Sequence, residues 1–283
     1  MDKKRGFTLI ELLVVIAIIA LLMSILMPAL SKVRKQAMSV SCLARLKQWG
    51  VIFSMYASEN DGYMNTRMVG TDYSKLWYLV FKPMYKDRTM RYCPTAVNNT
   101  LKRGPYATWW ADKMGQWDPE DFPVPGEGDA DSQKGDNAPT GSYGMNRYIE
   151  NMTGGITSAS PLYWRKVDVR GADRAPVMMD CLYIYYWAGD DEIPPEYNGD
   201  FTTPEMHYIQ IDRHMGYNNV CFLDSSARKV GLKELSTLRH TKPAETGFDI
   251  CNRWTICGNG GNILACKALW DEYANWMTKM PVY

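Results

Sequence analysis

Glu11 is the one ionisable side chain in an apolar run that extends from Phe7 to Met27. A carboxylate in such surroundings is costly to leave unpaired inside a membrane, and intramembrane carboxylates commonly mark functional contacts. We therefore expect Glu11 to pair with a positively charged group, because pairing offsets the desolvation of both charges.

A second set of reactive side chains lies near residue 220. His214 and Asp224, followed by two serines, supply the residue types of a nucleophile triad, but no G-x-S-x-G sequence surrounds the serines. The sequence instead predicts a structural role, in which His214 donates a hydrogen bond that fixes residues 215–218 and Asp224 caps a turn. We expect no catalytic residue and interpret the chain as a protein that is not an enzyme.

The sequence predicts no metal centre and no cofactor. It contains three histidines, and it has neither an H-E-x-x-H sequence nor paired C-x-x-C sequences. Four acidic residues carry hard oxygens that suit calcium: Asp190, Asp191, Glu192 and Asp200. Their spacing fits no EF-hand pattern, so a solvated loop is the favoured interpretation.

Seven cysteines allow several disulfide arrangements, and their odd number leaves at least one of them unpaired. Cys42 and Cys93 are the first candidate pair. Cys181 and Cys221 lie in apolar runs, where buried free thiols are at least as expected as a bridge. The second candidate pair is two of the three C-terminal cysteines, Cys251, Cys257 and Cys266.

Aromatic residues make up 12% of the chain and suggest polysaccharide as an alternative partner. Trp109 and Trp110 beside Trp117, and the aromatic run at 183–187, could offer flat faces to sugar rings. Core packing and subunit contacts are the commoner fate of such side chains. The net charge of +1, with scattered basic residues, predicts no nucleic-acid partner.

The apolar run that contains Glu11 is long enough to be a membrane-spanning helix. At about 1.5 Å rise per residue it crosses a hydrocarbon core of roughly 30 Å. Three basic residues precede it, which predicts a cytoplasmic N-terminus and a chain that continues in the periplasm or cell exterior. No small-residue cleavage site follows the run, so we expect a retained single-pass anchor in contact with lipid.

The helical pattern continues beyond the membrane to about residue 60. Apolar residues recur at steps of three, four and seven from Leu30 to Met55. Pro28 should kink this helix without ending it, and the turn residues at 60–62 should end it. A second apolar face begins at Leu43 and indicates burial under a globular domain.

The rest of the chain predicts an α+β fold with short strands. The β-favouring runs at 219–223 and 227–231, joined by turn residues at 224–226, predict a hairpin. The run at 175–184 predicts a neighbouring strand. Because the pattern shows no βαβ rhythm, we expect an antiparallel sheet packed on the long helix.

The sequence K-R-G-F-T-L-I-E-L-L-V-V-I-A-I-I-A, which begins at residue 4, resembles the signal of type IV pilins and type II secretion pseudopilins. The resemblance implies cleavage by prepilin peptidase between Gly6 and Phe7, followed by N-methylation of Phe7. It also implies that Glu11 pairs with the N-terminal amine of a neighbouring subunit during assembly. Pro28 matches a proline common in pilins.

This resemblance implies three parts of the chain. They are a leader at 1–6, a transmembrane and amphipathic spine helix at 7–60, and an extracytoplasmic α+β domain at 61–283. It also implies a structural subunit of a pilus or pseudopilus, with prepilin peptidase and other pilin subunits as partners. The alternative is an envelope-anchored protein that uses the signal for sorting and binds polysaccharide.

The sequence R-H-M-G-Y-N-N-V-C-F-L-D-S, at 213–225, resembles pilin-like proteins that carry an H-x9-D-G element. His214 and Asp224 have the required nine residues between them. Ser225 stands where the family has glycine, which puts in doubt a turn that needs a positive φ at that position.

Overall fold

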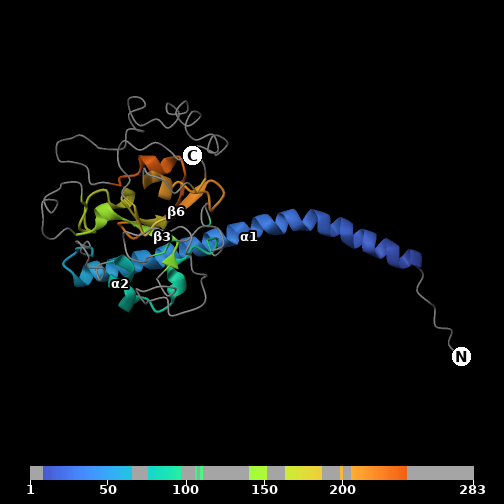
Figure 1. The fold of residues 1–283 in the computed structure, drawn as a ribbon, viewed down its shortest axis with the longest axis horizontal. Coiled ribbons are helices and arrows are strands. Elements are labelled where there is room, and N and C mark those ends of the chain that lie inside the picture. The colour runs from blue at the N-terminus through green and yellow to red at the C-terminus, as the bar shows by residue number, and fades with distance from the viewer. Residues whose placement is uncertain are drawn as a thin grey trace, which may run out of the picture.

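The structure of the protein, a computed structural model, describes residues 9–65, 76–96, 106, 109–110, 140–151, 163–186, 198–199 and 205–240. The expected cleavage site, the acidic residues at 190–200 and the three C-terminal cysteines lie outside these residues. The described part contains one long helix, a five-stranded sheet and several short helical turns (Figure 1).

Helix α1 (Leu9–Glu59) is a single element of 51 residues. Pro28 lies inside it without ending it, as predicted, because the helical pattern resumes at once on its C-terminal side. The helix ends at Glu59, and the amide of Gly62 then donates to the carbonyl of Ala57. Asp61 and Gly62 both have positive φ, which is the left-handed geometry that closes many helices.

The main sheet has the strand order β5-β3-β4-β6-β7. The strands are β3 (Tyr143–Asn146), β4 (Pro176–Asp180), β5 (Tyr185–Tyr186), β6 (Tyr217–Phe222) and β7 (Ala227–Gly231). The predicted hairpin is confirmed as β6 and β7, and the predicted neighbouring strand is β4, which pairs with β6. A separate two-stranded pair joins β1 (Trp109–Trp110) and β2 (Thr140–Gly141).

One pairing in the sheet differs from the antiparallel prediction, since β5 runs parallel to β3. The chain reverses from β3 to β4 and reverses again before β5. It therefore returns in the direction of β3 and pairs on the side of β3 that β4 leaves open. The predicted absence of parallel pairing is wrong for a two-residue strand, which leaves no periodic signal in a sequence.

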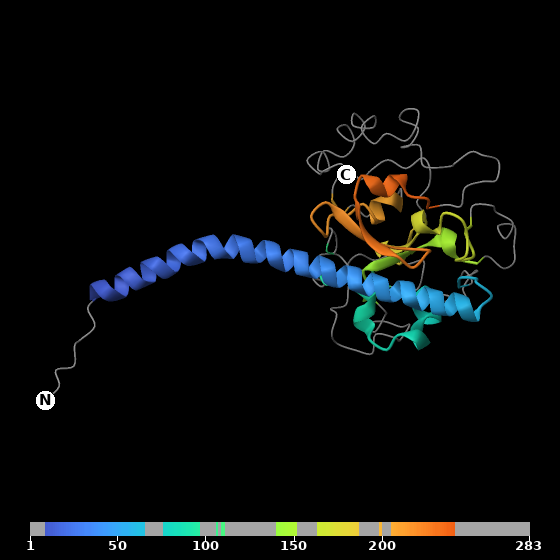
Figure 2. The ribbon, with the colours of Figure 1, turned by 180° about the vertical axis from the view of Figure 1, so that it is seen from behind.

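The spine, as we call α1, has an exposed half and a covered half. Its buried residues begin at Ser39 and continue to Ala57, and this half contacts β6 and β7. Helix α2 (Trp77–Val80) and the turns near it lie on the side of α1 opposite the sheet in both views (Figures 1 and 2). The N-terminal half extends away from the ectodomain, the name used here for the described residues after Glu59.

Apolar side chains fill both faces of the sheet. Neighbours on one strand alternate: Met178 packs in the core that includes α1, and Met179 packs in the core on the far face. The far face is covered by the turns η8 (Glu205–Tyr208) and η9 (Glu234–Thr237). Every residue of β4 is buried, as expected for a strand enclosed on both faces.

Gly50 allows α1 to lie directly on the hairpin. A Cβ at this position would stand 2.8 Å from the carbonyl oxygen of Ser225 and 3.3 Å from the sulfur of Cys221. Such a contact forces the backbone to shift, so only glycine fits at this crossing without displacement.

Candidate functional site

The exposed half of the spine is an apolar surface without a cover in the structure. Its large apolar side chains from Leu9 to Leu30 are 46–78% exposed. The same half is long and apolar enough to cross a membrane by length and composition. Glu11 lies two residues inside the described start of this helix.

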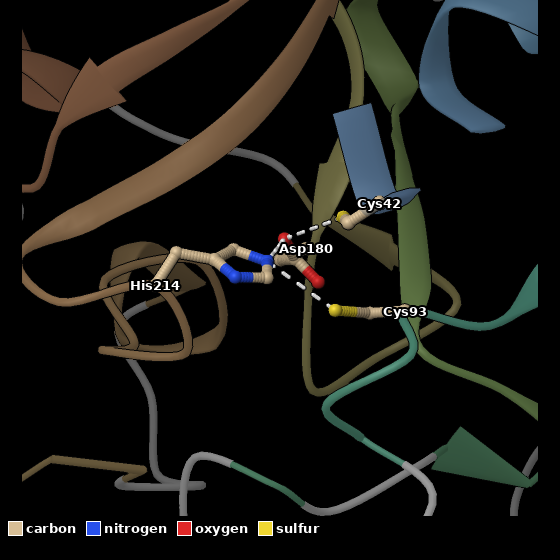
Figure 3. A group of neighbouring side chains, drawn as sticks. All are labelled: Cys42, Cys93, Asp180 and His214. Carbon is tan, nitrogen blue, oxygen red and sulfur yellow. Dashed lines mark hydrogen bonds and ion pairs between the residues drawn. The ribbon is translucent and has the colours of Figure 1, made fainter. Parts of the chain in front are cut away.

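A second site lies where the spine enters the ectodomain. Four buried side chains converge there from four segments of the chain (Figure 3). Cys42 comes from α1, Cys93 follows the turn η3 (Arg88–Arg91), Asp180 ends β4, and His214 precedes β6. The metal-ligating atoms of these residues all lie within 4.8 Å of one another. This group is called the Cys-Asp-His cluster below.

The carboxylate of Asp180 stands at the centre of the cluster. Its Oδ2 lies 3.0 Å from Nε2 of His214 and accepts a hydrogen bond from Sγ of Cys42 at 3.4 Å. Nε2 of His214 also lies 3.3 Å from Sγ of Cys93. The imidazole ring of His214 thus contacts the cluster through Nε2. Its Nδ1 has no hydrogen-bond partner among the described residues.

The sequence around His214 explains how the aspartate is held. The guanidinium of Arg213 donates to Oδ1 of Asp180 at 3.0 Å and to the carbonyl of Ser142 at 2.7 Å. The side-chain amide of Asn218 accepts from the backbone amide of Asp180 and donates to its carbonyl, at 3.0 and 2.9 Å. The next residue, Asn219, donates to the carbonyl of Ser39 on the spine.

Two hydroxyl groups contact the sulfur atoms of the cluster. Tyr143 donates to Sγ of Cys42 at 3.2 Å, and the hydroxyl of Thr95 lies 2.8 Å from Sγ of Cys93. The backbone amide of Cys93 donates to the hydroxyl of Ser142 at 2.6 Å, which fixes the position of this cysteine against the sheet. Each cysteine therefore has support from a neighbouring strand or turn.

The charges of the cluster shift the pKa values of its members. Burial raises the pKa of Asp180, but the opposing effects of His214 and Arg213 are stronger and lower it to about 2. Burial lowers the pKa of His214, yet the Asp180 carboxylate raises it to about 10. Burial raises the pKa of Cys93, while hydrogen bonds from Cys42 and His214 lower it to about 6. The effect of burial on each of these pKa values is thus outweighed by the neighbouring groups of the cluster.

Strand β6 separates His214 from Asp224. His214 precedes this strand and is buried in the cluster, whereas Asp224 follows it and is exposed. Among the described residues, His214 does not make the expected hydrogen bond to residues 215–218. Its Nε2 lies against Asp180 and Cys93 instead. The nine-residue spacing is therefore the length of one strand with its two flanking turns.

The turn after β6 forms with serine in place of glycine. Ser225 has a φ of 63°, so it adopts the positive φ that the glycine of the related proteins suggested. Oδ1 of Asp224 accepts from the amide of Ser226 at 2.9 Å, as expected of an aspartate that caps a turn. The spine stabilises this turn, because Lys47 donates to the carbonyl of Ser225.

The four described cysteines are free thiols. Cys42 and Cys93, the first candidate disulfide pair, are neighbours in the cluster and are not bonded to each other in the structure. Cys181 and Cys221 are buried without a bridge, which fits the expectation of buried thiols in apolar strands.

The aromatic run at 183–187 does not form a flat binding face in its described part. Tyr185 and Tyr186 are 1% and 0% exposed, and Tyr185 packs below the guanidinium of Arg147. Trp117 and Trp187 lie outside the described residues. Tyr183 is half-buried and packs against the same core, so the described aromatics of this run contribute mainly to core packing.

The Cys-Asp-His cluster has no metal-binding sequence pattern that predicts it. Its members are at least 34 residues apart along the chain, so no local spacing in the sequence indicates the cluster. One signal was present, because Asp180 interrupts the apolar run at 175–184. A carboxylate inside a buried strand needs a partner, and the search for one leads to His214.

Comparison with known proteins concerns the N-terminal part of the chain. Residues 1–27 match the family model described as the prokaryotic N-terminal methylation motif. The chain is pilin-like. The Type IV wide pilus major component PilA4 of Thermus thermophilus is 42% identical over 67 residues, which are 24% of this chain and 51% of that protein. The chain thus covers about half the length of this relative. No solved structure matches the chain.

The pilin-like assignment agrees with the fold. A long N-terminal apolar helix followed by a five-stranded sheet is the predicted layout, with the one parallel pairing as its exception. The motif and the relative both associate the N-terminal part of the chain with pilus proteins. They also support a protein that is anchored by its N-terminal helix.

Proposed function

We propose that the chain is a structural subunit of a type IV pilus or type II secretion pseudopilus. The observation that carries this proposal is the methylation motif at 1–27, which continues into a 51-residue helix with an uncovered apolar half. Apolar surface of this extent has to be covered by lipid or by other helices. A subunit that moves from a membrane into a filament exchanges the first cover for the second.

Processing is the first step of the proposed pathway. Prepilin peptidase cleaves between Gly6 and Phe7 on the cytoplasmic side, and the new amine of Phe7 is methylated. The basic residues before the apolar run support a cytoplasmic N-terminus, with the ectodomain in the periplasm or cell exterior. Glycine at position 6 leaves the backbone accessible to the peptidase, because it has no Cβ.

Assembly is the second step and uses the spine. The carboxylate of Glu11 pairs with the amine of Phe7 of a neighbouring subunit. Pairing answers the cost of both charges in an apolar environment and sets the axial offset between subunits. The apolar side chains of the exposed half supply contact area between subunits but do not fix this axial offset.

The experiment is the intact mass of the protein taken from membranes, with fragmentation of its N-terminus. We expect a chain that begins at Phe7 and carries one additional methyl group. Gly6→Ala should retain the leader, because the added Cβ obstructs the peptidase. Ser24→Ala, a small change within the same apolar segment, should be processed normally. A wild-type chain that begins at Met1, or one that begins after Pro28, would contradict the pathway.

A further inference from the structure

The Cys-Asp-His cluster has the composition of a metal site rather than of a hydrophobic core. We propose that one zinc ion fastens the spine to the ectodomain and is bound by four side chains: Cys42, Cys93, Asp180 and His214. This goes beyond the role of a filament subunit and does not depend on how the chain is processed. It rests on the ligand types, their separations, their burial and their origin in four segments.

Three of the six separations between the ligand atoms are close to those of a tetrahedral zinc site, and all six are within 4.8 Å. Zinc binds cysteine sulfur at about 2.3 Å and histidine nitrogen or carboxylate oxygen at about 2.0–2.2 Å, so the edges of the tetrahedron are roughly 3.4–3.8 Å. The ligand atoms are 3.0 Å apart between Asp180 and His214, 3.3 Å apart between Cys93 and His214, and 3.4 Å apart between Cys42 and Asp180. These three separations would lengthen by a few tenths of an ångström on zinc binding, and any of the others that approach 4.8 Å would shorten by up to about 1 Å.

The ligand set and its charge select zinc among the common metals. Two thiolates with one imidazole are soft or borderline ligands, which calcium and magnesium avoid and zinc prefers. Two thiolates and one carboxylate carry three negative charges. Zinc and the buried guanidinium of Arg213 carry three positive charges, so the filled site is neutral in total. Binding displaces to solvent the protons that the two sulfur atoms and Nε2 of His214 carry in the metal-free chain, because zinc binds thiolates and neutral imidazole.

The surroundings of the cluster orient the ligands as in a built metal site. Arg213 donates to Oδ1 of Asp180, so Oδ2 remains available to face the other ligands. Tyr143 and Thr95 place hydroxyl groups against the two sulfur atoms. Hydrogen bonds of this kind fix the ligands and disperse the charge on thiolates.

The burial of the cluster indicates a structural ion. All four residues are 0–1% exposed, so four protein ligands would close the coordination sphere and leave no position for substrate. Cys42 is near the first buried turn of the spine, which starts at Ser39. The ion would therefore join the spine to β4, to the segment after η3 and to the loop before β6, at the point where the helix leaves the ectodomain.

Two other chemistries fit the same four residues less well. A disulfide between Cys42 and Cys93 would need an external oxidant such as a periplasmic dithiol oxidase, and it would leave Asp180 and His214 without a reason to face the sulfurs. A thiolate nucleophile at Cys93 would need access for substrate, and Cys93 is 0% exposed. Each alternative predicts a different mass or thiol count.

The test uses the full chain, purified in detergent without chelators. Elemental analysis should find one zinc per chain. In denaturant without reductant, a thiol reagent should label both Cys42 and Cys93. A metal-free chain with both thiols intact, a chain that is two hydrogens lighter through a Cys42–Cys93 bond, or stoichiometric copper or iron in place of zinc would each overturn the proposal.

Variants compare the cluster with a cysteine outside it. Cys93→Ala and His214→Ala should each lose the zinc. Cys221→Ala, which changes an equally buried cysteine on β6, should retain one zinc per chain. Retention of zinc by Cys93→Ala would overturn the assignment of that ligand.

A measurement on the unmodified chain covers the case in which the variants do not fold. Removal of zinc by a chelator should lower the Tm, and zinc but not magnesium should restore it. At free zinc about 1,000-fold above Kd, the rise should be roughly 8–16 °C for a domain of this size. Cobalt in place of zinc should give the absorption of a tetrahedral thiolate site. An unchanged Tm, or cobalt bound without thiolate bands, would contradict the proposal.

Discussion

At the scale of single residues, His240 shows how burial sets a protonation state. Its Nε2 donates to the carbonyl of Leu235 at 2.7 Å, and its ring meets the ring of Tyr186 edge-on. Nδ1 has no partner among the described residues. Burial lowers the pKa of His240 to about 4, and the hydrogen bond to Leu235 opposes this shift only in part. The folded state therefore holds a neutral imidazole.

The low pKa of His240 predicts a loss of stability in acid. The unfolded chain binds this proton near pH 6.5, and the folded chain binds it only near pH 4. Between these values the unfolded state holds more protons, so the free energy of unfolding falls as the pH is lowered, by up to about 3 kcal/mol from this group. Denaturant unfolding between pH 7 and pH 4.5 measures the effect.

The matched variant is His240→Gln, whose amide can still donate to Leu235. This variant should lose less stability over the same pH range, because it has no group to protonate. Contributions from all other titrating groups cancel when the two curves are subtracted. Parallel curves for the wild type and the variant would show that His240 does not set the slope.

Asp180 marks the limit of what residues alone can predict. Its place in an apolar strand signals a buried charge, and the Arg213-His214 pair shows two cations close together in sequence. Nothing in the sequence states that these cations face that carboxylate, because the contact depends on the pairing of β4 with β6. The same is true of Cys42, which reaches the cluster only because the spine crosses the sheet.

At the scale of elements, the spine and the hairpin could be predicted because their signals are local. The helix carries a continuous period, and the hairpin carries two β-favouring runs with turn residues between them. β5 has two residues, so its parallel pairing with β3 depends on the path of the chain and on the docking of Trp77, whose indole donates to the carbonyl of Ile184. Such a contact has no counterpart in local sequence.

Trp49 is the main anchor between the spine and its covering elements. Its ring is fully buried and meets the rings of Trp77 and Tyr85 edge-on, at 5.2 and 4.9 Å between centroids. Its indole donates to the carbonyl of Met90 at 2.7 Å. One side chain thus joins α1 to α2 and to the turn η3, which lies across from the sheet.

Trp49→Ala should therefore destabilise the ectodomain strongly. Replacing a buried tryptophan by alanine typically costs about 3–5 kcal/mol, and here the carbonyl of Met90 also loses its donor. Val51→Ala is the control, because Val51 lies on the same helix and is 50% exposed. Denaturant unfolding of the full chain should show a large shift for the first variant and a small one for the second. Equal shifts would mean that the contacts of Trp49 are not the anchor.

At the scale of the whole molecule, one helix serves two environments. The covered half of the spine lies between the sheet and α2 (Figure 2). The exposed half carries mainly apolar side chains, with Glu11 among them. The covered half contributes to the stability of the ectodomain, and the exposed half provides the surface for contacts with lipid or other subunits. Changes in the two halves should therefore affect different measurements.

Glu11→Val should leave the molecule folded and inserted in the membrane while it impairs assembly. The change removes the proposed partner of the Phe7 amine and adds apolar surface, so insertion should not suffer. A loss of about 1.4 kcal/mol in each subunit contact lowers the association constant about tenfold. Glu59→Val is the control, because Glu59 is an exposed glutamate at the other end of the same helix. Sheared filaments counted against membrane-bound protein should fall for Glu11→Val and stay level for Glu59→Val, whereas wild-type filament numbers from Glu11→Val would refute the pairing role.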